Sequence, residues 1–204
     1  AFSLYYETSL TREYQRKWVN TSAHFLWLGA RNLESDAHVH YLSQISNPIG
    51  IKVPACVDTD RLIQVIKTIN PGNKKGKVTL IVRMGVSDVA CSLPTIINAI
   101  MDAELSVNWF SDPMHGNTRT DASEKKYRII NELSQETRVT RELLHRYGAH
   151  LSGIHLETTF HHTVAECIIH EHELCPDRAY LSALDPRLNP QQVNLLVDHV
   201  FSAS

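Results

Sequence analysis

The sequence predicts an α/β fold with a parallel sheet, because short apolar runs alternate along the chain with segments of helical periodicity. The runs have the length and composition of buried strands, and the segments between them are long enough to hold crossover helices. In chain order, the predicted strands cover residues 25–28, 49–53, 78–82, 107–110, 154–156 and 180–184.

Two helices are predicted between the early strands, each with an apolar stripe on one face. The first covers residues 60–69, with Asp58 or Thr59 as its N-cap and the breaker Asn70-Pro71-Gly72 at its end. The second has Pro94 in its first turn, where the missing N–H of proline leaves no helical hydrogen bond unmade.

Three more helices are predicted toward the C-terminus. A long one covers residues 123–147 and ends at Gly148 as its C-cap, and a weaker one covers residues 163–173. In the last, Asn189 is the N-cap and Pro190 the first helical residue.

Size and composition are those of an ordinary globular protein. The 204 residues suit a single domain over residues 1–204, and 43 % of them are hydrophobic. A net charge of −2 gives no reason to expect nucleic acid or an anionic membrane surface as a partner. No apolar run is long enough to span a membrane, and the first residues do not have the pattern of a secretory signal. Four cysteines without C-x-x-C spacing indicate reduced thiols, so the expected compartment is the cytoplasm.

Residue patterns alone leave two architectures open. Six strand–helix units can form an open, doubly wound sheet, or they can be six of the eight units of a (β/α)8 barrel. In either architecture ligands bind at the C-terminal ends of the strands, so polar residues at those ends are the candidates for function.

Three strand ends carry groups that suit a divalent metal. The heptapeptide 112–118, Asp-Pro-Met-His-Gly-Asn-Thr, follows one strand and contains His115, while Glu157 and Asp185 follow the next two. Imidazole and carboxylate together are typical ligands of Mn, Fe, Co or Zn. The alternative interpretation of the heptapeptide by itself is a solvated polar loop.

Six motifs, in this order, identify a family resemblance. They are Ser22-Ala23-His24-Phe25-Leu26-Trp27-Leu28-Gly29, Asn47-Pro48-Ile49-Gly50-Ile51-Lys52, Asn70-Pro71-Gly72-Asn73-Lys74 through Arg83-Met84-Gly85, Asp112-Pro113-Met114-His115-Gly116-Asn117-Thr118, Gly153-Ile154-His155-Leu156-Glu157 and Asp185-Pro186-Arg187-Leu188-Asn189. Together they closely resemble the class II (plant-type) 3-deoxy-D-arabino-heptulosonate 7-phosphate (DAHP) synthases. The resemblance implies a (β/α)8 TIM barrel that condenses phosphoenolpyruvate with erythrose 4-phosphate in the first step of the shikimate pathway, which leads to the aromatic amino acids.

The resemblance also implies roles for individual residues. His115, Glu157 and Asp185 are expected to bind a divalent metal (Mn, Co or Zn) at the ends of barrel strands six to eight. Lys52 and Arg83 are expected to hold the phosphate and carboxylate of phosphoenolpyruvate, and with His115 they form the expected catalytic set. The substrate pocket is expected to include Trp27, Arg31 and Asp112 as well.

The chain departs from the family pattern at several points. It begins just before barrel strand three, so the first two βα units, with a cysteine ligand on strand one and an arginine on strand two, have no counterpart among its residues. The family's Gly-Glu-Arg reads Gly29-Ala30-Arg31, and the basic stretch that serves the sugar phosphate is shortened to residues 119–126. The family's Thr-Gly-Glu-Asn has become residues 159–162, so the second substrate is the least defined part of the expectation.

The expected function is therefore a metal-dependent DAHP synthase-like transferase that takes erythrose 4-phosphate or a modified tetrose phosphate, the latter in a secondary-metabolite branch. The alternatives are a split-barrel subunit and a catalytically inactive paralogue that binds a ligand or a regulatory partner. Because six strands cannot close an eight-stranded barrel, we expect an oligomer, or completion by another chain or segment that carries strands one and two.

Other candidate residues receive structural interpretations. His155 shares a strand face with Glu157 and is expected to be a hydrogen-bonded interior histidine. Glu136 is expected on a charged, solvent-facing side of the long helix, and Trp18 and Trp109 are expected in the core.

Overall fold

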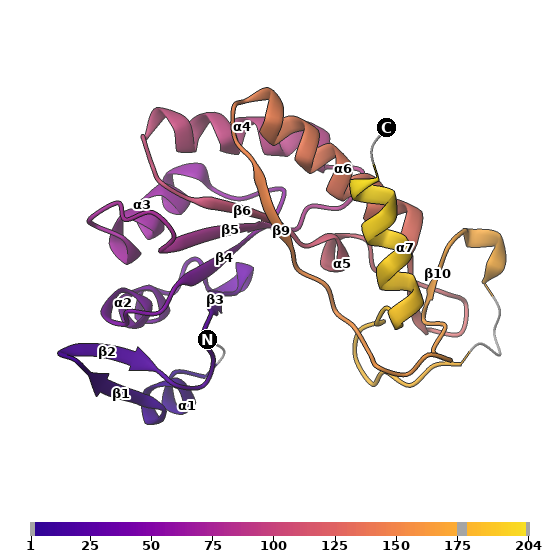
Figure 1. Ribbon diagram of the computed structural model, residues 1–204, viewed down its shortest axis with the longest axis horizontal. Helices are drawn as coiled ribbons and strands as arrows, with labels where there is room; N and C mark the ends of the chain where they lie inside the picture. Colours follow the sequence, from indigo (N-terminus) through magenta and orange to yellow (C-terminus); the bar gives the residue numbers. More distant parts are fainter. Residues whose placement is uncertain (1–2, 175–178, 203–204) are drawn as a thin grey trace.

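The computed structural model describes residues 3–174 and 179–202, and its centre is a parallel sheet of five strands. The strands are adjacent in the order in which they occur along the chain, and Figure 1 shows them crossing the middle of the molecule. They are β3 (Leu26–Leu28), β4 (Ile49–Val53), β5 (Val78–Val82), β6 (Asn108–Ser111) and β9 (Leu151–Ile154). This arrangement confirms the predicted α/β fold with a parallel sheet.

The two middle strands are buried along their whole length. Every residue of β4 and β5 is buried, as expected for parallel strands covered on both faces. Ile51 and Leu80 on these strands belong to the main hydrophobic core, together with Ile66 and Ile97 from the neighbouring helices. Continuous burial explains why their predicted bounds match the structure.

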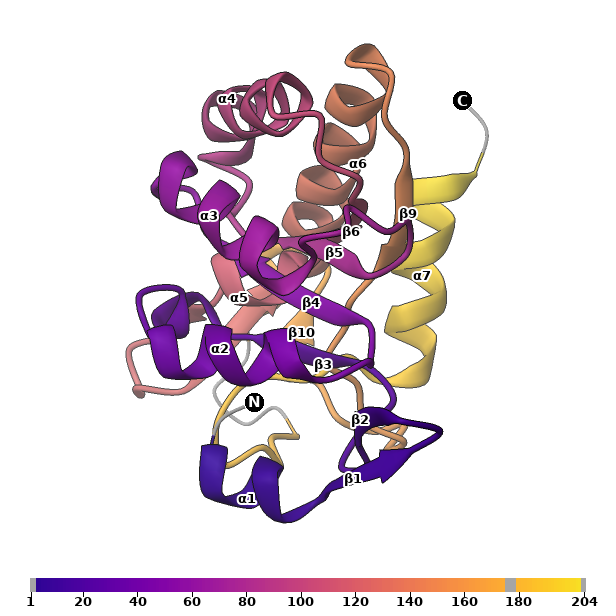
Figure 2. The same cartoon turned by 90° about the vertical axis from the view of Figure 1, so that its left-hand side faces the viewer.

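A row of helices runs alongside the sheet. It consists of α2 (Asp36–Gln44), α3 (Thr59–Ile69), α4 (Val89–Asp102), α6 (Ile130–Arg146) and α7 (Pro190–Phe201). Each packs against the next in that order, and Figures 1 and 2 show them as an arc along one side of the strands. Within the described residues, no helix is long and apolar enough to cross a membrane.

Two helices of this row, α3 and α7, have the N-caps predicted from the sequence. The Asp58 side chain accepts hydrogen bonds from the backbone N–H groups of Asp60 and Arg61 at 2.9 and 3.2 Å, so Asp58 is the N-cap of α3. Asn189 caps α7 through a reciprocal capping box with Gln192.

The start of α4 was predicted one turn too late. The helix begins at Val89, so Pro94 lies inside it and not in its first turn. Gly85, which has a φ of +89°, accepts hydrogen bonds at its carbonyl oxygen from the N–H groups of Asp88 and Val89. These bonds form a turn just before Val89, so the helix begins there and not near Pro94.

The predicted helix over residues 123–147 is correct only from residue 130 onward. Before it lies β8 (Lys126–Ile129), which pairs antiparallel with β7 (Arg119–Thr120) and parallel with β10 (Cys167–Ile168). The predicted helix over residues 163–173 is wrong as well, because this segment supplies β10 and the short 3-10 helix η2 (Glu171–Glu173). Gly148 has a φ of +76° and follows the last residues of α6, as expected for a glycine that ends a helix.

The sixth predicted strand does not form in the described part of the chain. Residues 180–184 are irregular, and the only pairing nearby is a single parallel bridge between Thr158 and Leu188. The apolar run of residues 180–184 therefore has no neighbouring strand beside it, and Leu181 and Leu184 are exposed.

The N-terminal segment adds elements that the sequence did not suggest. They are α1 (Leu4–Ser9), the hairpin of β1 (Thr11–Tyr14) and β2 (Lys17–Asn20), and the 3-10 helix η1 (Ala30–Asn32). Trp18, expected in the core, lies on this hairpin with 51 % of its surface exposed, whereas Trp109 is buried as expected.

Two strand-end loops touch through glycine backbones. A Cβ atom on Gly116 would lie 2.6 Å from the Cα of Gly85, and one on Gly85 would lie 2.8 Å from the carbonyl oxygen of Gly116. Such distances leave no room for a side chain, so the loop after β5 and the loop after β6 are held against each other.

This contact yields a stability prediction. Gly116→Ala is expected to lower the free energy of unfolding by roughly 2–3 kcal/mol, because the added methyl group meets rigid backbone. The control is Gly72→Ala, where the nearest atom is a flexible lysine side-chain carbon at 3.5 Å and a change within about 0.5 kcal/mol is expected. Urea denaturation measures both, and equal midpoints for the two variants would contradict the predicted backbone clash.

Candidate active site at the strand ends

One cavity of about 520 Å³ lies at the C-terminal ends of the strands and collects nearly all the residues selected from the sequence. Its lining includes seven of the eight: Trp27, Arg31, Lys52, Arg83, His115, Glu157 and Asp185. The eighth, Asp112, is fully buried and bonded to two of these side chains. His155 and Ala30 also line the cavity.

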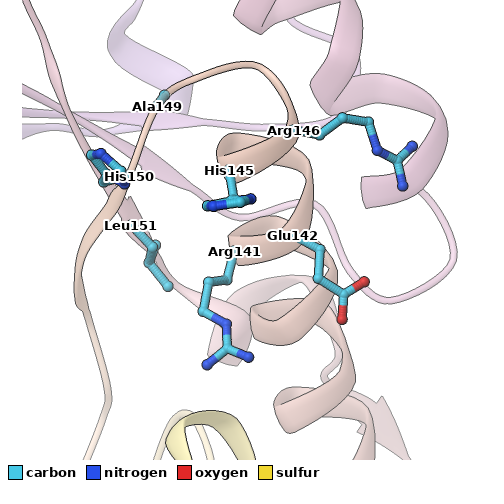
Figure 3. A pocket seen from close by; sticks show the side chains of 7 residues that line it. All are labelled: Arg141, Glu142, His145, Arg146, Ala149, His150 and Leu151. Carbon is cyan, nitrogen blue, oxygen red and sulfur yellow. The ribbon is translucent and has the colours of Figure 1, made fainter. Parts of the chain in front are cut away.

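A larger hollow of about 750 Å³ lies at the opposite end of β9, beside α6. Figure 3 shows its lining, in which the side chains of Glu142 and Arg146 point away from His150. It contains none of the selected residues and no convergent set of polar groups. The strand-end cavity is therefore the candidate site.

His115, Glu157 and Asp185 converge within this cavity. Each offers one ligand atom, and these three atoms lie within 4.8 Å of one another. The Nε2 atom of His115 faces Glu157 Oε1 at 3.4 Å, while its other ring nitrogen is bonded elsewhere. One imidazole and two carboxylates at this spacing have the donor chemistry that suits a divalent cation.

Asp112 orients the His115 ring through a hydrogen bond to its Nδ1 atom. It is the N-cap of α5 (Pro113–Gly116), and its Oδ2 atom lies 2.8 Å from His115 Nδ1. A carboxylate on the second nitrogen of a ligating histidine fixes the ring and its tautomer. Hydrogen bonds to Asp112 and then to Glu157 raise the pKa of the His115 imidazole to about 9, and a metal would have to displace that proton to bind.

Asp112 also holds Lys52. The Lys52 Nζ atom lies 2.5 Å from Asp112 Oδ2, and both side chains are buried. Burial alone would raise the pKa of Asp112, but the hydrogen bond from His115 and the charge of Lys52 hold it well below its usual range. Burial lowers the pKa of Lys52, and Asp112 offsets part of that effect. One carboxylate therefore joins the candidate metal-binding half of the cavity to its cationic half.

The cationic half consists of Lys52, Arg83 and Arg31. The Nε atom of Arg83 is buried and has no hydrogen-bond partner among the described residues, so it remains available for a ligand. Trp27 forms a wall beside them, with its ring centroid 5.7 Å from Lys52 Nζ and 5.3 Å from that of His155. Guanidinium and ammonium groups together match a small molecule that carries phosphate and carboxylate.

Sequence reasoning missed two buried charges behind the site. Glu136 was expected to face solvent, but it is fully buried and accepts hydrogen bonds from Met84 N at 2.9 Å and Asn117 Nδ2 at 2.6 Å. Its burial could have been predicted from helical spacing: Glu136 lies three residues after Leu133 and four before Thr140, so the three share the buried face of α6. Burial raises the pKa of Glu136 to about 6.

The second missed residue is Arg128, which was hidden in the incorrectly predicted helix. It is fully buried, and its Nη1 atom donates to Glu157 Oε2 at 2.7 Å. Burial alone would raise the pKa of Glu157, but the hydrogen bonds from His115 and Arg128 lower it to about 2.

Comparison with known proteins identifies the family. The model of the class-II DAHP synthetase family matches residues 1–200. The chain belongs to this family. A relative named phospho-2-dehydro-3-deoxyheptonate aldolase, from Neurospora crassa, is 37 % identical over 206 residues, which cover 95 % of this chain and 42 % of the relative. One of the same name from Streptomyces coelicolor is 36 % identical over 198 residues, or 94 % and 44 % of the two chains.

A solved structure gives the same likeness at the level of fold. The phospho-2-dehydro-3-deoxyheptonate aldolase from Francisella tularensis SCHU S4 matches with a TM-score of 0.58 and 16 % identity, over 87 % of this chain and 54 % of that one. The chain spans less than half the length of the two relatives from Neurospora crassa and Streptomyces coelicolor.

Burial of Glu136 predicts a pH dependence of stability. Its pKa is about 6 in the folded state against 4.5 for an ordinary glutamate, so its contribution is fully present below pH 4.5 and is lost as the pH rises through 6. Relative to Glu136→Gln, the wild type is expected to lose about 2 kcal/mol of unfolding free energy between pH 4.5 and 7.

Urea titrations at several pH values measure this difference. Glu142→Gln, which changes an exposed carboxylate on the same helix, is the matched control and should follow the wild type. If the unfolding free energies of the wild type and Glu136→Gln differ by the same amount at every pH, the raised pKa of Glu136 is contradicted.

Proposed function

We propose that this chain is the C-terminal portion of a (β/α)8 barrel DAHP synthase. In this proposal β3, β4, β5, β6 and β9 are barrel strands three to seven, and residues 180–184, which are irregular here, correspond to strand eight. The five described parallel strands are adjacent in chain order, with the helices in one row beside them. A doubly wound sheet would instead reverse its strand order at a switch point and carry helices on both faces. Strands one and two come from another segment or chain, which places a partner strand beside β3 and makes an oligomeric or composite protein.

We propose that the reaction is the condensation of phosphoenolpyruvate with erythrose 4-phosphate or a modified tetrose phosphate, in the cytoplasm. The observation that carries this proposal is that His115, Glu157 and Asp185 line the same cavity as Lys52 and Arg83. It combines a divalent-metal donor set with cations suited to a small phosphorylated acid, as family membership leads one to expect.

In this proposal the chain's own residues bind and orient the two reactants. Arg83 and Lys52 hold the phosphate and carboxylate of phosphoenolpyruvate against the wall formed by Trp27, while the hydrogen bond to Asp112 holds Lys52 in place. His115, Glu157 and Asp185 hold the divalent metal (Mn, Co or Zn), which when bound supplies Lewis acidity toward the aldehyde oxygen.

The bonds then change in a balanced sequence. The enol carbon of phosphoenolpyruvate forms a carbon–carbon bond with the aldehyde carbon. The aldehyde oxygen takes up a proton and becomes a hydroxyl. Water adds at the neighbouring carbon and loses a proton, and the carbon–oxygen bond to phosphate then breaks, which leaves a ketone and releases inorganic phosphate. Holding both reactants in one cavity removes the entropic cost of bringing them together in the reaction step.

One observation favours a second candidate, an inactive paralogue or split-barrel subunit that binds a ligand or regulatory partner. Ala30 lies on the cavity wall where the family pattern has a glutamate. If that position contributes its backbone N–H, activity is retained, and if it contributes a carboxylate, only binding remains.

Metal removal tests the proposed activity. Treatment of the protein, purified together with the segment or chain that supplies strands one and two, with EDTA is expected to abolish phosphate release from phosphoenolpyruvate and erythrose 4-phosphate. Added Mn²⁺ or Co²⁺ should restore it. His115→Ala should lower the restored rate by at least about 100-fold, since the loss of one electrostatic contact typically costs that much.

The control for this assay is His172→Ala, because His172 is an exposed histidine that does not line the cavity. Phosphate release that persists unchanged in EDTA, or in His115→Ala, would contradict a metal-dependent reaction at this site. No release from any tetrose phosphate, with phosphoenolpyruvate binding intact, would favour the binding-protein candidate.

A further inference from the structure

Arg128 is the largest fully buried side chain in the described part of the chain. Transferring a guanidinium from water into a protein interior is unfavourable by several kcal/mol unless it is paired and hydrogen-bonded. The hydrogen bonds that Arg128 makes must therefore compensate for its lost hydration.

The Arg128 guanidinium contacts all three strand-end loops that carry the metal-site residues. Its Nη1 atom donates to Glu157 Oε2 at 2.7 Å and to the carbonyl oxygen of Pro186, which directly follows Asp185. Its Nε atom donates to Thr118 Oγ1 at 2.9 Å, and Thr118 lies three residues after His115. A single planar group thereby fixes the relative positions of these loops.

The strand that carries Arg128 is itself held on both sides. β8 pairs with β7 and β10, and Arg128 stands opposite Cys167 in the second of these pairings. Lys126, two residues earlier and so on the same strand face, places its Nζ atom 2.8 Å from Asp185 Oδ1. β8 thus directs one cation to each of the two carboxylates of the site.

We propose that Arg128 is a positioning residue for the metal centre: it orients Glu157 and sets the spacing of the loops that carry His115, Glu157 and Asp185. The inference rests on the proposed metal site and adds a residue that does not itself touch the metal. Its directed hydrogen bonds strengthen metal binding by holding the ligands in place.

Charge alone would have the opposite effect. A cation beside Glu157 reduces the negative potential that attracts a second cation, so removal of the positive charge would tighten metal binding if charge were the main contribution. Geometry and charge therefore predict changes of opposite sign, which makes the inference testable by binding alone.

The experiment is a Mn²⁺ titration of the purified protein without substrates, with free Mn²⁺ measured by electron paramagnetic resonance. Arg128→Lys retains the charge but loses the forked donor geometry, and it is expected to raise the Mn²⁺ dissociation constant about 10- to 100-fold. Arg128→Gln should weaken binding as well. Arg119→Lys, which changes the exposed neighbouring arginine, is the matched control and should leave the constant unchanged.

Thr118→Val keeps the test decisive if the arginine variants do not fold. It removes the hydroxyl that accepts from Arg128 Nε and that also donates to the carbonyl oxygen of Met114 at 3.1 Å, and it is expected to weaken Mn²⁺ binding several-fold. Unchanged affinity in Arg128→Lys or Thr118→Val, or tighter binding in Arg128→Gln, overturns this inference and leaves the proposed function standing. A wild-type protein that takes up no Mn²⁺ overturns both.

Discussion

The carboxylate of Asp112 is the interaction on which the candidate site depends. Its two oxygens meet Lys52 Nζ, His115 Nδ1 and the N–H of Met114, although the side chain is fully buried. A buried carboxylate is tolerated only when such partners compensate for its lost hydration. Because Lys52 comes from β4 and His115 from the loop after β6, this one group fixes the distance between the proposed anion-binding and metal-binding sides of the cavity.

A second group of buried charges supports the loops around Asp112. Arg128 holds the loops of Glu157 and Asp185, while Glu136 ties the backbone after Arg83 to Asn117, two residues beyond His115. Both belong to the continuous β8–α6 segment that follows the His115 loop. One continuous segment therefore makes hydrogen bonds to several strand-end loops at once. Such contacts hold the side chains of a site in place when they come from separate loops.

Sequence reasoning was most successful where a residue's environment depends on its close neighbours. The bounds of β4 and β5 were predicted because continuous apolar runs are typical of strands buried on both faces, and Asp58 and Asn189 were identified from local capping chemistry. The candidate site residues were selected because strand ends and family motifs mark them, and seven of the eight line one cavity. Prediction failed where distant pairing decides the outcome: β8 is a strand because β7 and β10 flank it, and Glu136 and Arg128 are buried because partners far along the chain complete their hydrogen bonds. Residues 180–184 have the composition of a strand but no described neighbour to pair with.

The central claim is that His115, Glu157 and Asp185 bind one divalent cation together. Anomalous X-ray diffraction from crystals grown with Mn²⁺ tests it most directly, because it locates the metal independently of activity. We expect a single strong peak within coordination distance of His115 Nε2 and of one carboxylate oxygen each from Glu157 and Asp185. A peak elsewhere in the molecule, or bound Mn²⁺ that leaves these three side chains uncoordinated, would contradict the claim.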